Sequence, residues 1–265
     1  MQATVTVPFG LITVPGGWRY HPAIVAQATA TLTQMFPGRF EWLALGSGEK
    51  LNEAVVGQGW PGKDERNVRL LAGAEILRVM FSGERVSRGG AVPVENAQLY
   101  PRPAHQVSLA AAALSPETAE WAGGWADGLL TICQEREALQ KVVTAFRKGG
   151  GEGKPVYLQV HLSFAATDTE ARANAFDQWR SNAIDADAAE NLDTPEAFET
   201  HTAGVTHADM DKYVRISADP TRHVEWLRGD MEMGFEAIYL HNVGRNQAEF
   251  IEAFGRDVLP VLKAG

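Results

Sequence analysis

The chain has 265 residues, of which 45% are hydrophobic and 22% charged, and this balance excludes disordered, collagen-like and disulfide-framework proteins. With 24 Lys and Arg against 33 Asp and Glu, the net charge is −9, and no basic stretch could follow a phosphate backbone, so nucleic acid is not an expected partner. The single cysteine, Cys133, excludes an intrachain disulfide. Because no apolar run could span a bilayer and no signal peptide is recognisable, we expect a cytoplasmic protein without membrane association.

Strands and helices alternate along the sequence. The predicted strands are apolar or alternate with a period of two, and they cover residues 5–14, 40–45, 107–113, 128–133, 155–165 and 237–241. The predicted helices have capping residues, prolines or glycines at their ends; one begins at Pro22, one at Ser115, and the others cover 64–82, 136–148, 172–182, 220–233 and 247–263. Residues 84–103, rich in glycine and proline, predict a hairpin outside this series, and 183–205 reads as helical and irregular.

This order of elements limits the fold. Strands separated by helices pair in parallel through right-handed crossovers, which leaves an α/β doubly wound sheet or a closed eight-stranded barrel. About six strands are counted, so the sequence predicts either an open sheet or a barrel with two strand-helix units missing. No linker or repeat interrupts the series, and a single domain over 1–265 is expected.

Five sequence strings are distinctive: 19–22 (RYHP), 36–40 (FPGRF), 45–53 (LGSGEKLNE), 125–128 (WADG) and 238–241 (IYLH). Together they resemble the luciferase-like flavin and deazaflavin oxidoreductases. The strings 149–161 and 177–180 are most similar to the FMN-dependent subgroup described as non-deazaflavin. The resemblance implies a (β/α)8 TIM-barrel fold in which residues 5–14 match the third strand, so we expect the first two strand-helix units, and an Asp-His pair that relatives place beside the flavin, to be absent from this sequence.

In such a barrel the ligand lies at the carboxyl ends of the strands. After the strand at 40–45, Ser47 can donate a hydrogen bond and Gly48 lets the backbone approach a planar ring. The resemblance implies that Glu49 and Asn52 lie at the cofactor or substrate, with Glu49 as the catalytic residue that holds or moves a proton. In the competing interpretation, Glu49 only charges the N-terminus of the next helix and Asn52 only caps it.

Two other strand ends are expected to contact the cofactor. The resemblance implies that Thr13 and Val14 lie beside the ring and that the flavin phosphate lies at Ala113, Leu114 and Ser115. A helix begins there, and its free N–H groups can bind a phosphate. Many relatives have Gly-Gly where this chain has Leu114-Ser115, and the alternative is that Ser115 is a plain N-cap.

A substrate pocket is predicted from three more residues. His161 lies on the polar face of its strand and His241 ends the last strand, so both are expected to point into the pocket, with Trp179 as a wall. For each of them the alternative is a structural role. We expect His21, which precedes Pro22, to cap its helix rather than to move protons, and no His spacing supports a metal site.

The sequence therefore predicts an enzyme: an FMN-dependent oxidoreductase or luciferase-like monooxygenase acting on a small organic substrate. One alternative is a deazaflavin coenzyme on the same scaffold; another is a catalytically inactive flavin-binding fragment or association module, suggested by the strand edges that two missing units would expose. Where related sugar-phosphate dehydrogenases have basic residues, the resemblance places Glu135 and Ala248-Glu249, so a sugar phosphate is not expected. Expected partners are the substrate, a flavin reductase or reduced-nicotinamide donor, and further copies of the chain in a homo-oligomer.

Overall fold

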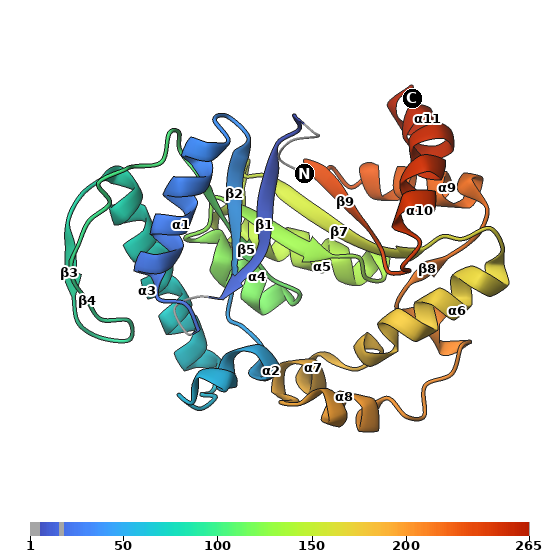
Figure 1. Ribbon diagram of the computed structural model, residues 1–265, viewed down its shortest axis with the longest axis horizontal. Helices are drawn as coiled ribbons and strands as arrows, with labels where there is room; N and C mark the ends of the chain where they lie inside the picture. Colours follow the sequence, from blue (N-terminus) through green and yellow to red (C-terminus); the bar gives the residue numbers. More distant parts are fainter. Residues whose placement is uncertain (1–5, 16–18, 265) are drawn as a thin grey trace. The chain divides into compact units, whose positions relative to one another are not determined.

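A computed structural model describes residues 6–15 and 19–264 (Figure 1). Its contacts divide the chain into two compact units, which are described in turn: the first comprises Met1–Leu130 and Val142–Lys154, the second Thr131–Lys141 and Pro155–Gly265. None of the helices in the described part combines the length and the apolar character that crossing a membrane requires. The predicted single domain stays a prediction.

The sheet of the first unit consists of parallel strands with helices between them. In the described part, β1 (Phe9–Pro15), β2 (Phe40–Gly46), β5 (Ser108–Ala112) and β6 (Gly128–Ile132) pair in that order, although the last two residues of β6 belong to the second unit. Leu43, Ala44 and Leu45 on β2 are at most 1% exposed. This confirms the prediction of a strand buried on both faces.

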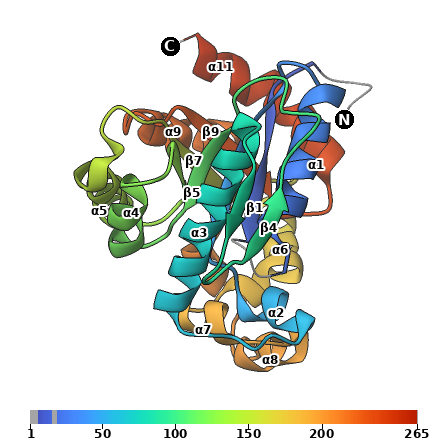
Figure 2. The same ribbon diagram turned by 90° about the vertical axis from the view of Figure 1, so that its left-hand side faces the viewer.

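The helices of this unit are α1 (Pro22–Met35), α2 (Lys50–Glu53) with the 3-10 turn Ala54–Val56, α3 (Lys63–Ser82) and α4 (Pro116–Gly123). Small residues of α1 and larger ones of α3, such as Ala26, Leu70 and Ile76, join the β2 side chains in one apolar core. The predicted hairpin is confirmed: β3 (Val86–Arg88) and β4 (Val94–Ala97) pair antiparallel, and they lie on the far side of α1 and α3 from the sheet (Figures 1 and 2).

Helix α5 (Arg136–Phe146) continues into a single π-helical turn, Arg147–Gly151, which lies against α4 in the first unit. A Cβ on Gly149 would lie 1.8 Å from the carbonyl oxygen of Glu120 in α4, and Gly150 has a φ of +108°. Only glycines allow so close an approach of two backbones. The helix predicted over 136–148 thus ends two residues earlier, at Phe146, and the Gly149-Gly150-Gly151 run forms part of the π-helical turn that packs against α4.

The second unit is built on β7 (Val156–Ser163), with which β8 (Arg215–Ile216) and β9 (Ala237–Asn242) pair in parallel. Alternate β7 residues Leu158, Val160 and Leu162 are at most 1% exposed and pack on the chain's last helices. These are α9 (Pro220–Met231), α10 (Gln247–Ala253) and, after the π-helical stretch Phe254–Val258, α11 (Leu259–Lys263). The period of two predicted for β7 thus separates its core face from a polar one.

Between β7 and α9 the second unit has short helices with side-chain caps. They are α6 (Asp168–Trp179), α7 (Ala186–Asn191) and α8 (Pro195–His201), with 3-10 turns at Arg180–Asn182 and Asp209–Lys212. Thr167, Asp185 and Thr194 each accept a hydrogen bond from the backbone N–H three residues later. These caps fix where helices begin in a stretch that has no apolar stripe.

The predicted α/β class with parallel strands is confirmed. The described residues hold six parallel strands of five to eight residues and the two-residue β8, where about six were predicted. Helix α6 begins at Asp168 instead of Arg172, because the Thr167 side chain already caps it. The strand predicted at 5–14 begins at Phe9 and ends at Pro15; Val5 and the turn at 16–17 lie outside the described residues.

Candidate functional site

The loop that follows β2 has a conformation that requires its glycine. Gly48 has a φ of +82°, and a Cβ there would lie 2.6 Å from Cγ of Glu53. Just before it, the ammonium group of Lys63 donates a hydrogen bond of 2.9 Å to Oγ of Ser47. Since Lys63 occupies a lone pair of that oxygen, the hydroxyl proton of Ser47 is directed elsewhere and can be donated. No sequence pattern marks Lys63, because its role comes from a tertiary contact with Ser47, 16 residues away.

Glu49 and Asn52 contact each other, and their predicted place at the cofactor or substrate stays a prediction. Nδ2 of Asn52 donates to Oε2 of Glu49 over 3.2 Å, and both side chains are exposed. The alternative in which Asn52 caps the next helix is wrong: Glu49 occupies the N-cap position of α2, without a side-chain cap bond, and Asn52 lies inside the helix. Asn52 therefore orients the Glu49 carboxylate.

Glu53 lies beneath this loop and is only 1% exposed. Its Oε2 accepts a hydrogen bond of 3.0 Å from the backbone N–H of Arg19, and the Arg19 guanidinium Nε lies 3.9 Å from Oε1. Burial raises the pKa of the Glu53 carboxyl above its ordinary value, and the contacts with Arg19 oppose this in part. Glu53 closes the string 45–53, but no periodicity in the sequence marks it as buried.

The end of β1 lies beside the same loop. In the parallel register Val14 is opposite Leu45, and a Cβ on Gly46 would lie 2.6 Å from Cγ2 of Thr13. Thr13 is exposed, whereas Val14 packs against the core of the first unit. The Thr13 side chain can thus contact a ligand at this edge, whereas Val14 can contact one only through its backbone.

The third predicted contact lies on the neighbouring strand, because Leu45 of β2 is in register with Ala111 of β5. Ala113 is 3% exposed and Leu114 is 48% exposed. Oγ of Ser115 accepts a hydrogen bond of 3.3 Å from the backbone N–H of Thr118, so Ser115 does cap α4. The carboxyl ends of β1, β2 and β5 therefore place Thr13, Ser47 and Ser115 along one edge of the sheet.

The three predicted substrate-pocket residues meet in the second unit. His161 and His241 face each other in the register of β7 and β9, with ring centroids 5.5 Å apart. The Trp179 ring lies 4.7 Å from the His161 ring and 5.0 Å from the His241 ring. Burial lowers the pKa of His161 to about 4 and also lowers that of His241, so both imidazoles are neutral at pH 7.

Other titratable groups have structural roles. The ring of His21 accepts a hydrogen bond from Ala23 N–H through Nδ1 (3.1 Å) and lies 2.8 Å from the Pro93 carbonyl through Nε2, which confirms its predicted cap at α1. Cys133 is half-buried, and burial raises the pKa of its thiol.

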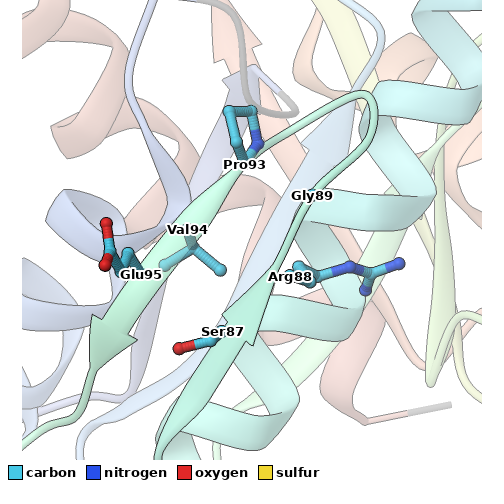
Figure 3. A pocket seen from close by; sticks show the side chains of 6 residues that line it. All are labelled: Ser87, Arg88, Gly89, Pro93, Val94 and Glu95. Atoms are coloured by element: carbon cyan, nitrogen blue, oxygen red, sulfur yellow. The ribbon is translucent and has the colours of Figure 1, made fainter.

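A surface hollow lies on the hairpin, apart from the predicted residues (Figure 3). It is lined by Ser87, Arg88, Gly89, Pro93, Val94 and Glu95. Arg88 forms an ion pair of 2.7 Å with Glu75, and Ser87 accepts the backbone N–H of Asn96. The ion pair joins the hairpin to α3, and the Ser87 hydrogen bond lies within the hairpin.

Residues 1–237 match the sequence profile of the family described as luciferase-like monooxygenase. The chain belongs to this family. The F420-dependent glucose-6-phosphate dehydrogenase of Nakamurella multipartita is 30% identical over 255 residues, which cover 93% of this chain and 75% of that protein. The protein of the same name from Beutenbergia cavernae is 31% identical over the same shares.

Two solved structures share the fold of this chain. An F420-dependent secondary alcohol dehydrogenase, solved in complex with an F420-acetone adduct, superposes with a TM-score of 0.89 at 24% identity, over 98% of this chain and 81% of that one. A coenzyme F420-dependent tetrahydromethanopterin reductase from Methanopyrus kandleri gives a TM-score of 0.73 at 20% identity, over 96% and 83%.

This luciferase-like protein is an oxidoreductase, as predicted. The predicted family is confirmed, but the narrower similarity to an FMN-dependent subgroup is not supported by the curated relatives above, which are named for F420.

Proposed function

We propose that this luciferase-like protein binds the deazaflavin coenzyme F420 and uses it to oxidise or reduce a small organic substrate. The observation that carries the proposal is the name shared by its curated relatives: besides the two above, six more proteins at 28–29% identity are named F420-dependent glucose-6-phosphate dehydrogenase. This favours the deazaflavin alternative over the FMN interpretation.

The donors at the strand ends of the first unit fit such a coenzyme. Ser47 presents a hydroxyl proton whose direction Lys63 fixes, and the Lys63 ammonium adds positive charge beside it. These groups suit the carbonyl edge of a planar ring. The N-terminus of α4, with exposed Leu114 and the cap at Ser115, suits a phosphate group.

When bound, the coenzyme supplies the hydride transfer. The protein then has to hold the coenzyme and move one proton to or from the substrate oxygen. Glu49 fits the second task, because its carboxylate is exposed after β2 and its orientation is fixed by Asn52. Glu53 supports the loop from below, where its packing against Gly48 keeps the Ser47–Glu49 backbone in place.

The test is binding of F420 and FMN to the purified chain, measured by the absorption spectrum that remains after desalting and by titration to obtain each Kd. We expect F420 to be retained with a lower Kd than FMN. Tighter binding of FMN would overturn the proposal in favour of the FMN interpretation. If neither is retained, this chain does not use either coenzyme, and the alternative of an association module is favoured.

Variants of Ser115 separate its two roles. Ser115→Ala removes the cap and should cost about 1 kcal/mol of unfolding free energy, whereas Ser115→Asp keeps a capping oxygen and should stay near wild type in denaturant titrations. The added carboxylate should nevertheless weaken F420 binding several-fold if the phosphate lies at α4. Equal F420 affinity in wild type and Ser115→Asp would show that the coenzyme phosphate does not lie at the N-terminus of α4.

A further inference from the structure

Three side chains from different elements of the second unit, His161, Trp179 and His241, form a small aromatic cluster. His161 lies near the carboxyl end of β7, His241 is the penultimate residue of β9, and Trp179 is the last residue of α6. The three ring centroids are 4.7 to 5.5 Å apart. Because ligands of this fold bind at the carboxyl ends of the strands, the cluster lies at the end where substrate is expected.

One polar atom in this cluster has no protein partner. Nδ1 of His241 is buried and, within the described part of the chain, accepts or donates no hydrogen bond. Leaving a buried polar atom unpaired costs about 1–3 kcal/mol, and native proteins usually pair such atoms with water or a ligand. The His241 ring contacts the rings of His161 and Trp179 in edge-to-face geometry.

The electrostatics of the cluster select against charge. Burial keeps both imidazoles neutral at pH 7, and each then offers one donor and one acceptor nitrogen. Arg245 forms an exposed ion pair of 3.8 Å with Asp177, and the guanidinium of Arg180, which follows Trp179, lies 5.3 Å over the Phe176 ring rather than over the cluster. The two neutral imidazoles offer a phosphate no positive charge in exchange for its lost water, whereas a hydroxyl or carbonyl group would gain hydrogen bonds from them.

We infer that His161, Trp179 and His241 form the substrate subsite, and that it takes an uncharged alcohol or ketone whose oxygen hydrogen-bonds to the imidazoles while its carbon skeleton lies on the indole. The inference rests on the proposed oxidoreductase function, and it names a substrate class different from the sugar phosphate in the names of the curated relatives. It also gives His241 Nδ1 its missing partner.

The binding test uses the whole chain without coenzyme. Cyclohexanol, cyclohexanone and cyclohexyl phosphate share one ring and differ in the polar group, so they are added in turn to protein labelled with 15N in its histidines. We expect saturable shifts of the His161 and His241 resonances with the alcohol and the ketone, and none with the phosphate. Shifts that are as large with cyclohexyl phosphate, or no shift with any probe, would overturn the inference.

Two variants make the test specific. His241→Phe keeps the ring packing and removes the nitrogens, so the His161 shift should need about tenfold more cyclohexanol. His201→Asn changes an exposed residue at the end of α8 and should leave that titration unchanged. Circular dichroism checks that both variants are folded. If His241→Phe is unfolded, Trp179→Phe replaces it, and weaker cyclohexanol binding is expected because the wall is smaller.

The F420-loaded enzyme separates this inference from the proposed function. With F420 bound, His241→Phe should raise the KM for cyclohexanol about tenfold, the equivalent of one hydrogen bond, with an unchanged Kd for F420. Turnover of cyclohexyl phosphate in preference to cyclohexanol would refute the subsite and leave the F420 proposal standing. If cyclohexanol shifts the histidine resonances in a chain that does not retain F420, the subsite stands and the F420 proposal is refuted.

Discussion

Glu53 shows how one buried carboxyl group can set the shape of a ligand loop. It is 1% exposed, accepts the Arg19 N–H and fills the space that a side chain at position 48 would need. Burial disfavours its charged form more than Arg19 favours it, so ionisation of Glu53 opposes folding. The loop that carries Ser47 and Glu49 is thus supported at some cost in stability.

We predict that Glu53→Gln becomes more stable relative to wild type as the pH rises. The folded-state pKa of Glu53 is raised above its ordinary value of 4.5, so the unfolded chain loses this proton first and wild-type stability falls as the pH increases through that range. The amide has no such proton and still accepts from Arg19. The measurement is the thermal midpoint of both proteins between pH 4 and pH 8.

Glu41→Gln is the matched control, because Glu41 lies on β2 in the same unit and is exposed. Its midpoint should stay close to wild type over the same pH range. If the thermal midpoint of Glu53→Gln falls relative to wild type as the pH rises, the ion pair with Arg19 stabilises the carboxylate more than its burial destabilises it.

At the residue scale, sequence reasoning could find the side chains that belong to continuous strings and could not find those that reach the site from elsewhere. Ser47, Glu49 and Asn52 stand together in one string, and the structure brings them together. Lys63 and Arg19 come from other segments, and their contacts with Ser47 and Glu53 depend on tertiary packing. Whether the predicted residues bind a coenzyme stays a prediction.

At the scale of elements, the contact between α4 and the π-helical turn at Arg147–Gly151 is unusually close. Besides the approach of Gly149 to Glu120, the ammonium group of Lys154 donates a hydrogen bond of 2.7 Å to the Gly123 carbonyl, and Lys148 forms an ion pair of 2.8 Å with Glu120. Since α4 carries the Ser115 cap, this contact also holds the predicted phosphate site.

Gly149→Ala should therefore destabilise the protein by about 2–4 kcal/mol, because the new methyl group meets a backbone carbonyl that cannot move alone. Gly89→Ala, where a Cβ would meet no atom within 4 Å, should change stability by less than about 0.5 kcal/mol. Urea titrations of the two variants give the comparison. Equal stabilities would show that α4 and the turn can separate without cost.

Elements were predictable where a local signal specifies them. The alternation on β7 and the caps at Ser115 and Asp219 gave strands and helix starts that the structure confirms. Strand β8 has two residues and exists only because it pairs with the end of β7, so no window of sequence could reveal it. The short α2 likewise follows from the turn at Gly48 and the burial of Glu53, which are tertiary effects.

At the scale of the whole molecule, β1 remains incompletely covered. Adjacent side chains of a strand point to opposite faces, yet Leu11 and Ile12 are 42% and 45% exposed, and within the described residues β1 pairs with β2 alone. Exposed apolar strand edges favour pairing with another chain. The homo-oligomer expected from the sequence remains a prediction, and the exposed apolar residues of β1 are the structural feature that most favours it.

We expect the purified chain to sediment at a multiple of its 28.8 kDa mass, with the fraction of larger species rising with concentration. Ile12→Lys should shift this equilibrium toward the monomer at least several-fold, because a charge on a strand edge opposes pairing. Val261→Lys, on an exposed apolar residue of α11, is the control for a general effect of added charge. A wild-type chain that is monomeric at all concentrations would contradict the expectation.

The β3–β4 hairpin offers a place where this chain could be lengthened. It lies on the outer side of α1 and α3, and its Gly89 and Gly90 are exposed (Figure 2). Loop tips of this kind accept inserted segments because no buried backbone hydrogen bond has to be broken. A peptide tag or a small reporter domain inserted between these glycines should leave the strand ends that carry Ser47 and Ser115 undisturbed, so the hairpin is a natural attachment point for immobilising or tracking the protein.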